Sequence, residues 1–191
     1  ETIHVPDLSV CSEGWEECRT RSRAAADAEG KLLAGFMGTG IFEQCHFLIG
    51  FEDTLTALYE HPDEMHELIE TITQYRLDNL QPDVIFSHDD WGTKNALFMK
   101  PEMWREFFKE PYRRFYGYIR SRGVIAIHHA DSYLVPIVDD MAEIGIQVWQ
   151  GTLPENDIPA LQRHLSGKLT LMGGFGAAID RADAQPDEIL A

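Results

Sequence analysis

The chain has 191 residues, of which 44% are hydrophobic and 25% are charged, a composition typical of one globular domain with a sizeable core. Its net charge of −16, without a basic cluster, argues against a nucleic-acid partner. Cys11, Cys18 and Cys45 form no CxxC pair, no signal peptide is visible and no apolar run approaches the ~20 residues of a membrane span, so we expect a cytoplasmic protein without a membrane partner.

Short apolar runs alternate with helical patterns along the chain. The runs lack the polar alternation of half-buried strands and cover residues 31–38, 83–88, 124–129, 146–151 and 169–175. Start and stop signals predict helices over residues 62–80, 101–123 and 159–167, and from Asp131 or Ser132 to Gly145. Pro111 is expected to kink or split the second of these helices.

This alternation, with short connections, predicts right-handed crossovers and a parallel sheet. A doubly wound sheet and a (β/α)₈ barrel both fit the pattern. A complete barrel needs ~250 residues, and five strands are visible here. We therefore expect a single α/β domain over 1–191 that forms the central part of a TIM-type barrel, with its flanking strands outside this sequence.

Polar residues follow several of the predicted strands. Ligand sites of parallel α/β folds lie at the carboxyl ends of the strands. An aspartate or serine after a strand is also a common helix cap, but two strands that both end in histidine and aspartate favour a functional site. The residues expected at this mouth are His88, Asp89, Asp90, His128, His129, Asp131 and Gln150.

Neighbouring residues of a strand point to opposite faces, so only one of His128 and His129 can face the mouth. His88 and His128 each stand four places after a valine, and this match favours His128. Asp89 and Asp90 alternate in the same way, so one faces the pocket and the other anchors the following loop.

Two long stretches carry a resemblance to a known family. They are "DVIFSHDDWGTKNALFMKPEMWREFFKEPYRRF", from Asp83, and "IAIHHADSYLVPIVDDMAEIGIQVW", from Ile125, followed by "KLTLMGGF". The chain resembles the uroporphyrinogen decarboxylase superfamily, whose fold is a distorted (β/α)₈ barrel. The superfamily holds several chemistries, so the resemblance alone does not choose among them.

Two branches of the superfamily match less well. The decarboxylases use an arginine-rich N-terminal segment, which is not found in this sequence. The thiol-activating methyltransferases bind zinc through a His-x-Cys pair and a distant cysteine. The corresponding stretch here reads His128-His129-Ala130, and no cysteine follows Cys45. Because alanine cannot ligate zinc, thiol activation is not expected.

A third branch, the methyltransferases of corrinoid-dependent O-demethylases, carries the zinc motif Glu-x14-Glu-x20-His. Glu52, Glu67 and His88 have this spacing. The resemblance thus implies zinc, a small-molecule methyl donor and a corrinoid on a partner protein. Glu67 falls inside a predicted helix and could instead face solvent. Glu43, beside the "GTG" turn, is a rival ligand.

We therefore expect a zinc-assisted methyltransferase that moves a methyl group from an O-methylated substrate to a corrinoid protein. Uroporphyrinogen decarboxylation and a non-catalytic barrel that binds a tetrapyrrole or corrinoid are the alternatives, and a homodimer is left open. His88, Asp90 and His128 are the expected catalytic residues. The expected substrate-binding residues are Asp89, Trp91, His129, Asp131, Trp149 and Gln150, with Trp91 and Trp149 placed to stack on an aromatic substrate.

Overall fold

A computed structural model describes residues 12–76, 82–176, 181–183 and 185–186. Its centre is a sheet of five parallel strands in the order β1-β2-β3-β4-β5. The strands are β1 (Ala34–Met37), β2 (Val84–His88), β3 (Ile125–His129), β4 (Val148–Thr152) and β5 (Thr170–Gly173). A doubly wound sheet reverses its strand order, whereas a barrel adds each strand beside the last. The fold is thus part of a TIM-type α/β barrel, as predicted.

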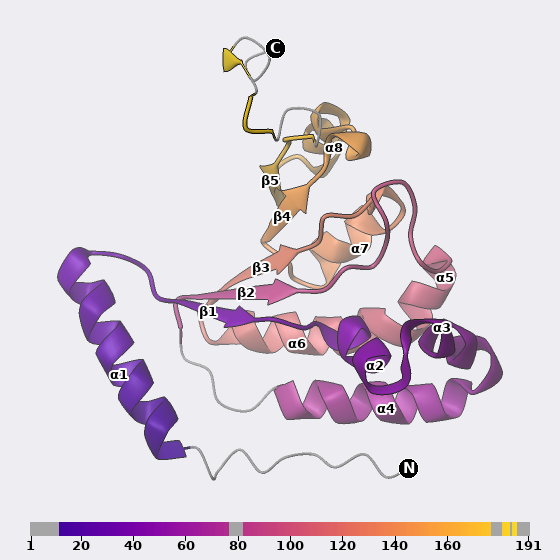
Figure 1. Cartoon of the computed structure of the whole chain (residues 1–191), viewed down its shortest axis with the longest axis horizontal. Coiled ribbons are helices and arrows are strands. Elements are labelled where there is room, and N and C mark those ends of the chain that lie inside the picture. Colours follow the sequence, from indigo (N-terminus) through magenta and orange to yellow (C-terminus); the bar gives the residue numbers. More distant parts are fainter. Residues whose placement is uncertain (1–11, 77–81, 177–180, 184, 187–191) are drawn as a thin grey trace.

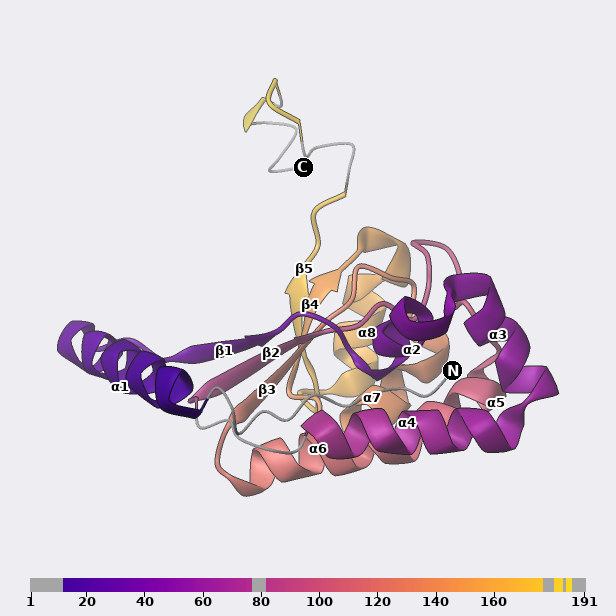
Figure 2. The same cartoon turned by 60° about the horizontal axis from the view of Figure 1, so that its bottom comes forward.

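Helices precede and connect the strands. They are α1 (Ser12–Glu29), α2 (Ile41–Ile49), α3 (Phe51–Glu60), α4 (Pro62–Arg76), α5 (Pro101–Trp104), α6 (Glu110–Ser121), α7 (Val138–Glu143) and α8 (Ile158–Leu165). Helices α4 and α6 lie side by side beneath one face of the sheet, while α2 and α3 lie beyond the ends of β1 and β2 (Figures 1 and 2). Among the described residues, no helix is long and apolar enough to cross a bilayer.

The two faces of the sheet differ in their cover. Ile85, Ala126 and Trp149 point toward the helices and are 0–2% exposed. The opposite face is open, and Phe36 and Met172 on it are 70% and 54% exposed. Because side chains alternate along a strand, each strand contributes to both environments. The large aromatic side chains of the core lie on the helix side: Trp91, Trp104, Trp149, Tyr112, Tyr116, Phe42, Phe107 and Phe108.

Two predicted helices differ in detail from the structure. The helix from Pro101 continues through a π-helical turn, Arg105–Lys109, and this wider turn directly precedes α6, in which Pro111 lacks an N–H donor. The helix expected from Asp131 or Ser132 begins later, with a 3₁₀ turn at Val135–Ile137. The hydroxyl of Ser132 donates to the carbonyl of Gly92 at 2.9 Å and does not cap the helix.

Candidate functional site

The carboxyl ends of β2, β3 and β4 bring three predicted site residues together. The strand register pairs His88 with His129 and His129 with Gln150. The imidazole rings of His88 and His129 are stacked, with centroids 4.7 Å apart and 16° between their planes. All three side chains belong to the open face of the sheet and are half-buried.

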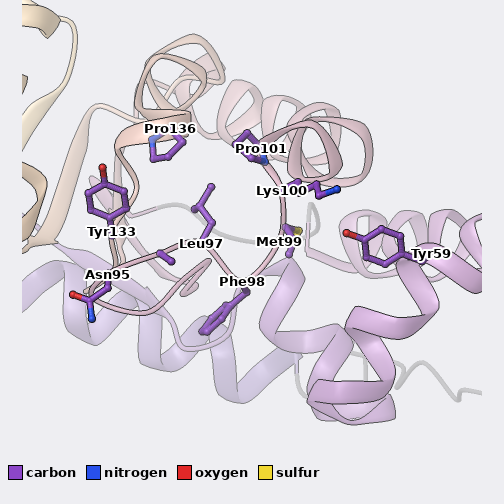
Figure 3. A pocket seen from close by; sticks show the side chains of 10 residues that line it. Tyr59, Asn95, Leu97, Phe98, Met99, Lys100, Pro101, Tyr133 and Pro136 are labelled. Carbon is purple, nitrogen blue, oxygen red and sulfur yellow. The ribbon is translucent and has the colours of Figure 1, made fainter.

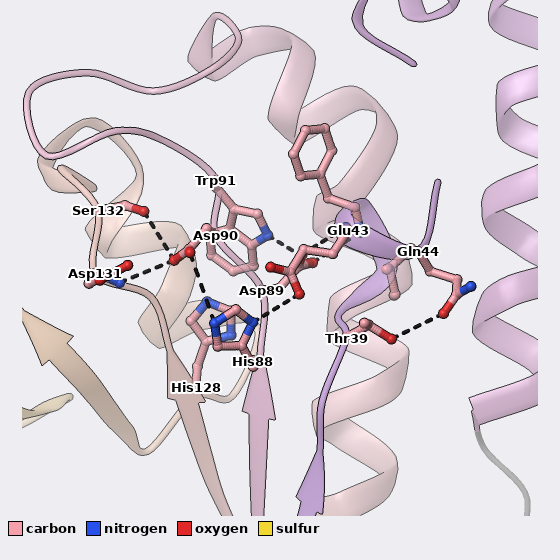
Figure 4. Close-up of polar contacts among 12 residues, drawn as sticks. Thr39, Glu43, Gln44, His88, Asp89, Asp90, Trp91, His128, Asp131 and Ser132 are labelled. Carbon is pink, nitrogen blue, oxygen red and sulfur yellow. Dashed lines mark hydrogen bonds and ion pairs between the residues drawn. The ribbon is translucent and has the colours of Figure 1, made fainter. Parts of the chain in front are cut away.

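Each of the two histidines is held at its Nδ1 atom. Nδ1 of His88 lies 2.9 Å from Oε2 of Glu43, which reaches it from α2 (Figure 4). Nδ1 of His129 is hydrogen-bonded to the amide oxygen of Gln150. A carboxylate oxygen and an amide oxygen both accept, so each Nδ1 donates its proton. The Nε2 atoms therefore carry the lone pairs that can bind a cation.

Asp90 completes the group. Its Oδ1 accepts the backbone N–H of Asp131 at 3.1 Å and lies 3.3 Å from the hydroxyl oxygen of Ser132. Its Oδ2 lies 3.9 Å from Nε2 of His88, and the side chains of both residues remain 27–28% exposed. One carboxylate oxygen is thus anchored while the other faces His88 (Figure 4).

His88, Asp90 and His129 can supply three ligand atoms that all lie within 4.8 Å of one another. Two imidazole nitrogens and a carboxylate oxygen are ligands that zinc accepts, and three protein ligands leave a coordination position open. The residues therefore fit a catalytic divalent metal. This ligand set differs from the predicted one, with which it shares only His88.

Electrostatics at the site reflect its carboxylates. Burial acts to lower the pKa of His88, but the hydrogen bond to Glu43 and the charges of Glu43 and Asp90 outweigh it, so this pKa is raised above its ordinary value. Burial, followed by the charge of Asp131, raises the pKa of Asp90. A divalent cation at this position would replace the proton on the imidazole and would reduce the repulsion among the carboxylates.

The structure does not bring the predicted metal set Glu52, Glu67 and His88 together. Glu52 lies in the first turn of α3 and Glu67 lies in α4, and both are exposed on these outer helices. Among the described residues they do not group with His88. The carboxylate that does contact His88 belongs to Glu43, the rival noted from the sequence.

The structure places His129, and not the expected His128, beside His88 on the open face. The pairing of β2 with β3 places Val84 opposite Ile125, one residue after Val124, so His88 pairs with His129 and Ser87 pairs with His128. A shift of one residue exchanges the two faces of a strand. His128 therefore lies on the helix side and is 0% exposed.

The surroundings of His128 are those of a core residue. Its Nδ1 is 2.7 Å from the hydroxyl of Tyr116, and its ring stacks on Trp91 with centroids 4.1 Å apart. Complete burial, assisted by the neighbouring charges of His129 and His88, lowers the pKa of His128 to about 3. The imidazole of His128 is therefore enclosed by the core and has no exposure to solvent in this structure.

Three predicted substrate-binding residues lie in the core. Trp91 and Trp149 are 0% exposed, and their Nε1 atoms donate to Asp89 and to the carbonyl of Ala130. Asp89 is also 0% exposed, and burial together with the charge of Glu43 raises its pKa to about 8. These positions face the helices, whereas His129, Gln150 and the exposed Asp131 remain beside the open face.

A separate groove of about 460 Å³ lies outside this cluster (Figure 3). It is lined by the loop of residues 95–101 together with Tyr59, Tyr133 and Pro136. None of the three residues of the candidate metal group lines it.

Comparison with known proteins places this fold and site in a family. The model of the uroporphyrinogen decarboxylase (URO-D) family matches residues 18–179. The chain belongs to the uroporphyrinogen decarboxylase family. The matched range includes β1 to β5 and every residue of the candidate metal group.

A solved structure supports the fold of this URO-D family chain. A methyltransferase from Methanosarcina mazei matches with a TM-score of 0.66 and 18% identity, over 82% of this chain and 46% of that chain. This URO-D chain thus spans about half of the length of that methyltransferase. A comparison with curated proteins gives no match.

Proposed function

We propose that the protein is a metal-dependent methyltransferase that moves a methyl group from an O-methylated small molecule to the corrinoid of a partner protein. The observation that carries this proposal is the group of His88, Asp90 and His129, whose ligand atoms lie within 4.8 Å at the carboxyl ends of adjacent parallel strands. Similarity to a methyltransferase from Methanosarcina mazei agrees with the proposal.

In this proposal the metal is zinc, held by Nε2 of His88, Nε2 of His129 and Oδ2 of Asp90. Zinc bound there would act as a Lewis acid on the ether oxygen and so stabilise the departing oxyanion. Glu43 and Gln150 hold the two imidazoles through their Nδ1 atoms. Each imidazole is thus already in the rotamer and tautomer that binds the metal.

Decarboxylation of uroporphyrinogen is less well supported by the described residues. The side chains around His88 are acidic, since Glu43 and Asp90 lie beside its imidazole and the charge of Asp131 acts on Asp90. Such a site repels the carboxyl groups of that substrate. The acidic surroundings instead favour a cation as the first ligand.

The proposal is tested on the full chain by metal analysis and by methyl transfer to a cob(I)alamin acceptor. We expect about one zinc per chain, as for a catalytic site with three protein ligands. His88→Ala should lose both the zinc and the transfer. His164→Ala is the matched control, because His164 is an exposed histidine paired with Asp139 at 2.8 Å, outside the metal group. Unchanged zinc content in His88→Ala would contradict the assignment, and turnover of uroporphyrinogen by zinc-free protein would favour decarboxylation.

A further inference from the structure

The buried carboxylate of Asp89 binds the first turn of a helix that is distant in sequence. Its Oδ1 accepts the backbone N–H of Glu43 at 2.8 Å, and its Oδ2 accepts the backbone N–H of Phe42 at 3.0 Å. The N-cap position of α2 is Gly40, which has no side chain to bind these amides. Asp89, 46 residues after Glu43 in the chain, thus accepts the hydrogen bonds that an N-cap side chain normally accepts.

Gly40 makes this approach possible. A Cβ atom at position 40 would lie 2.0 Å from both Cβ and Cγ of Asp89. The amide of the next residue, Ile41, donates to the hydroxyl of Tyr112 at 2.9 Å. The first turn of α2 is therefore fixed by Asp89, which directly follows β2, and by Tyr112 of α6, and it has no side-chain cap of its own.

The residue placed by this arrangement is Glu43. Its backbone N–H is bound by Asp89, and its own carboxylate lies 2.9 Å from Nδ1 of His88. Glu43 is only 8% exposed, so its side chain has little freedom to leave this contact. A continuous chain of contacts therefore leads from the core side of β2, through α2, to the imidazole on the open side.

We infer that Asp89 is a positioning residue that holds the first turn of α2 so that Glu43 fixes the tautomer and orientation of His88 for metal binding. The role in metal binding rests on the proposed function. The contacts themselves are present without metal, so the effect on the imidazole can be measured in metal-free protein. Removal of a group that orients a metal ligand typically lowers metal affinity by roughly 10- to 100-fold.

The test combines ¹⁵N NMR of the His88 ring with zinc titration of the full chain. In metal-free protein at alkaline pH, where the imidazole is neutral, we expect the Nδ1–H tautomer in the wild type. Asp89→Asn and Glu43→Ala should each shift His88 toward the Nε2–H tautomer and weaken zinc binding by roughly 10-fold or more. The double variant should lose no more than Glu43→Ala alone, because Asp89 acts through Glu43.

Two matched variants separate positioning from a general loss of structure. Glu43→Gln keeps an acceptor oxygen and should retain most of the Nδ1–H tautomer. Tyr112→Phe removes the partner of the Ile41 amide and a 3.4 Å contact of Trp91 but leaves both Asp89–α2 hydrogen bonds in place, so it should shift the tautomer less than Asp89→Asn does. Should Asp89→Asn fail to fold alone, it is measured in the background of Gly117→Ala, a change at an open helical position.

Three outcomes overturn the inference. They are an unchanged tautomer in Asp89→Asn, additive losses in the double variant, and a shift in Tyr112→Phe as large as that in Asp89→Asn. A wild-type protein that shows the expected tautomers but binds no zinc would instead overturn the proposed function and leave the positioning intact.

Discussion

His88 and His129 stack with their ring centroids 4.7 Å apart, and each donates its Nδ1 proton to a different side chain. The two partners, Glu43 and Gln150, come from α2 and β4. The shared register of β2 and β3 therefore aligns both rings, and the flanking elements set their tautomers. With Oδ2 of Asp90 at 3.9 Å from Nε2 of His88, the pair becomes a three-ligand group.

The two neighbouring histidines of β3 should respond in opposite ways to substitution. His129→Ala should abolish stoichiometric zinc binding, because it removes a ligand from the open face. His128→Leu should retain zinc while lowering stability, since it leaves the hydroxyl of Tyr116 without its 2.7 Å partner. Zinc content and urea denaturation of both variants check this expectation, and loss of zinc from His128→Leu alone would refute it.

The acidic residues of the outer helices should be dispensable for the metal. Glu52→Ala and Glu67→Ala remove exposed side chains from α3 and α4. We expect zinc content to be unchanged and the free energy of unfolding to shift by no more than about 0.5 kcal/mol. Asp90→Ala is the comparison and should lose zinc. Zinc loss in either glutamate variant would restore the ligand set predicted from the sequence.

Because of His128, the stability of the metal-free protein should decrease as the pH is lowered. Burial lowers the pKa of this imidazole from 6.5 to about 3. Below pH 6.5 His128 binds a proton in the unfolded chain but not in the folded chain. The unfolded state is therefore favoured as the pH decreases toward about 3. This one group should contribute a slope of about 1.4 kcal/mol per pH unit.

Urea denaturation of His128→Leu, in the presence of a chelator, isolates that contribution. The variant should show a shallower decrease in stability between neutral and mildly acidic pH than the wild type, whatever its absolute stability. Equal slopes in the two proteins would mean that His128 is protonated in the folded state.

Two glycines should give opposite results when replaced by alanine. Gly40→Ala places a methyl group 2.0 Å from the carboxylate carbon of Asp89 and should destabilise the protein by about 3 kcal/mol. Gly117→Ala, at an exposed position of α6 with open space around it, should stabilise it by about 1 kcal/mol. Thermal unfolding checks both, and a neutral Gly40→Ala would show that α2 does not approach Asp89 closely.

Local patterns in the chain were sufficient for several features of the fold. The apolar runs predicted all five parallel strands, although only the face of the sheet toward the helices is fully covered among the described residues. The polar residues after those runs predicted the edge of the sheet where the candidate metal group lies. Alternation along β2 also predicted that Asp89 and Asp90 separate, and their side chains do face the core and the open side.

Contacts between distant segments settled the rest. The register between β2 and β3 makes His129, and not His128, the partner of His88, and register depends on pairing that neither strand contains in its own residues. Glu43 reaches His88 because Asp89 and Tyr112 hold the start of α2, three segments far apart in sequence. The spacing of Glu52 and Glu67 suggested a ligand set, but spacing along a chain measures no distance in space, and the helices that carry them turn both side chains toward solvent.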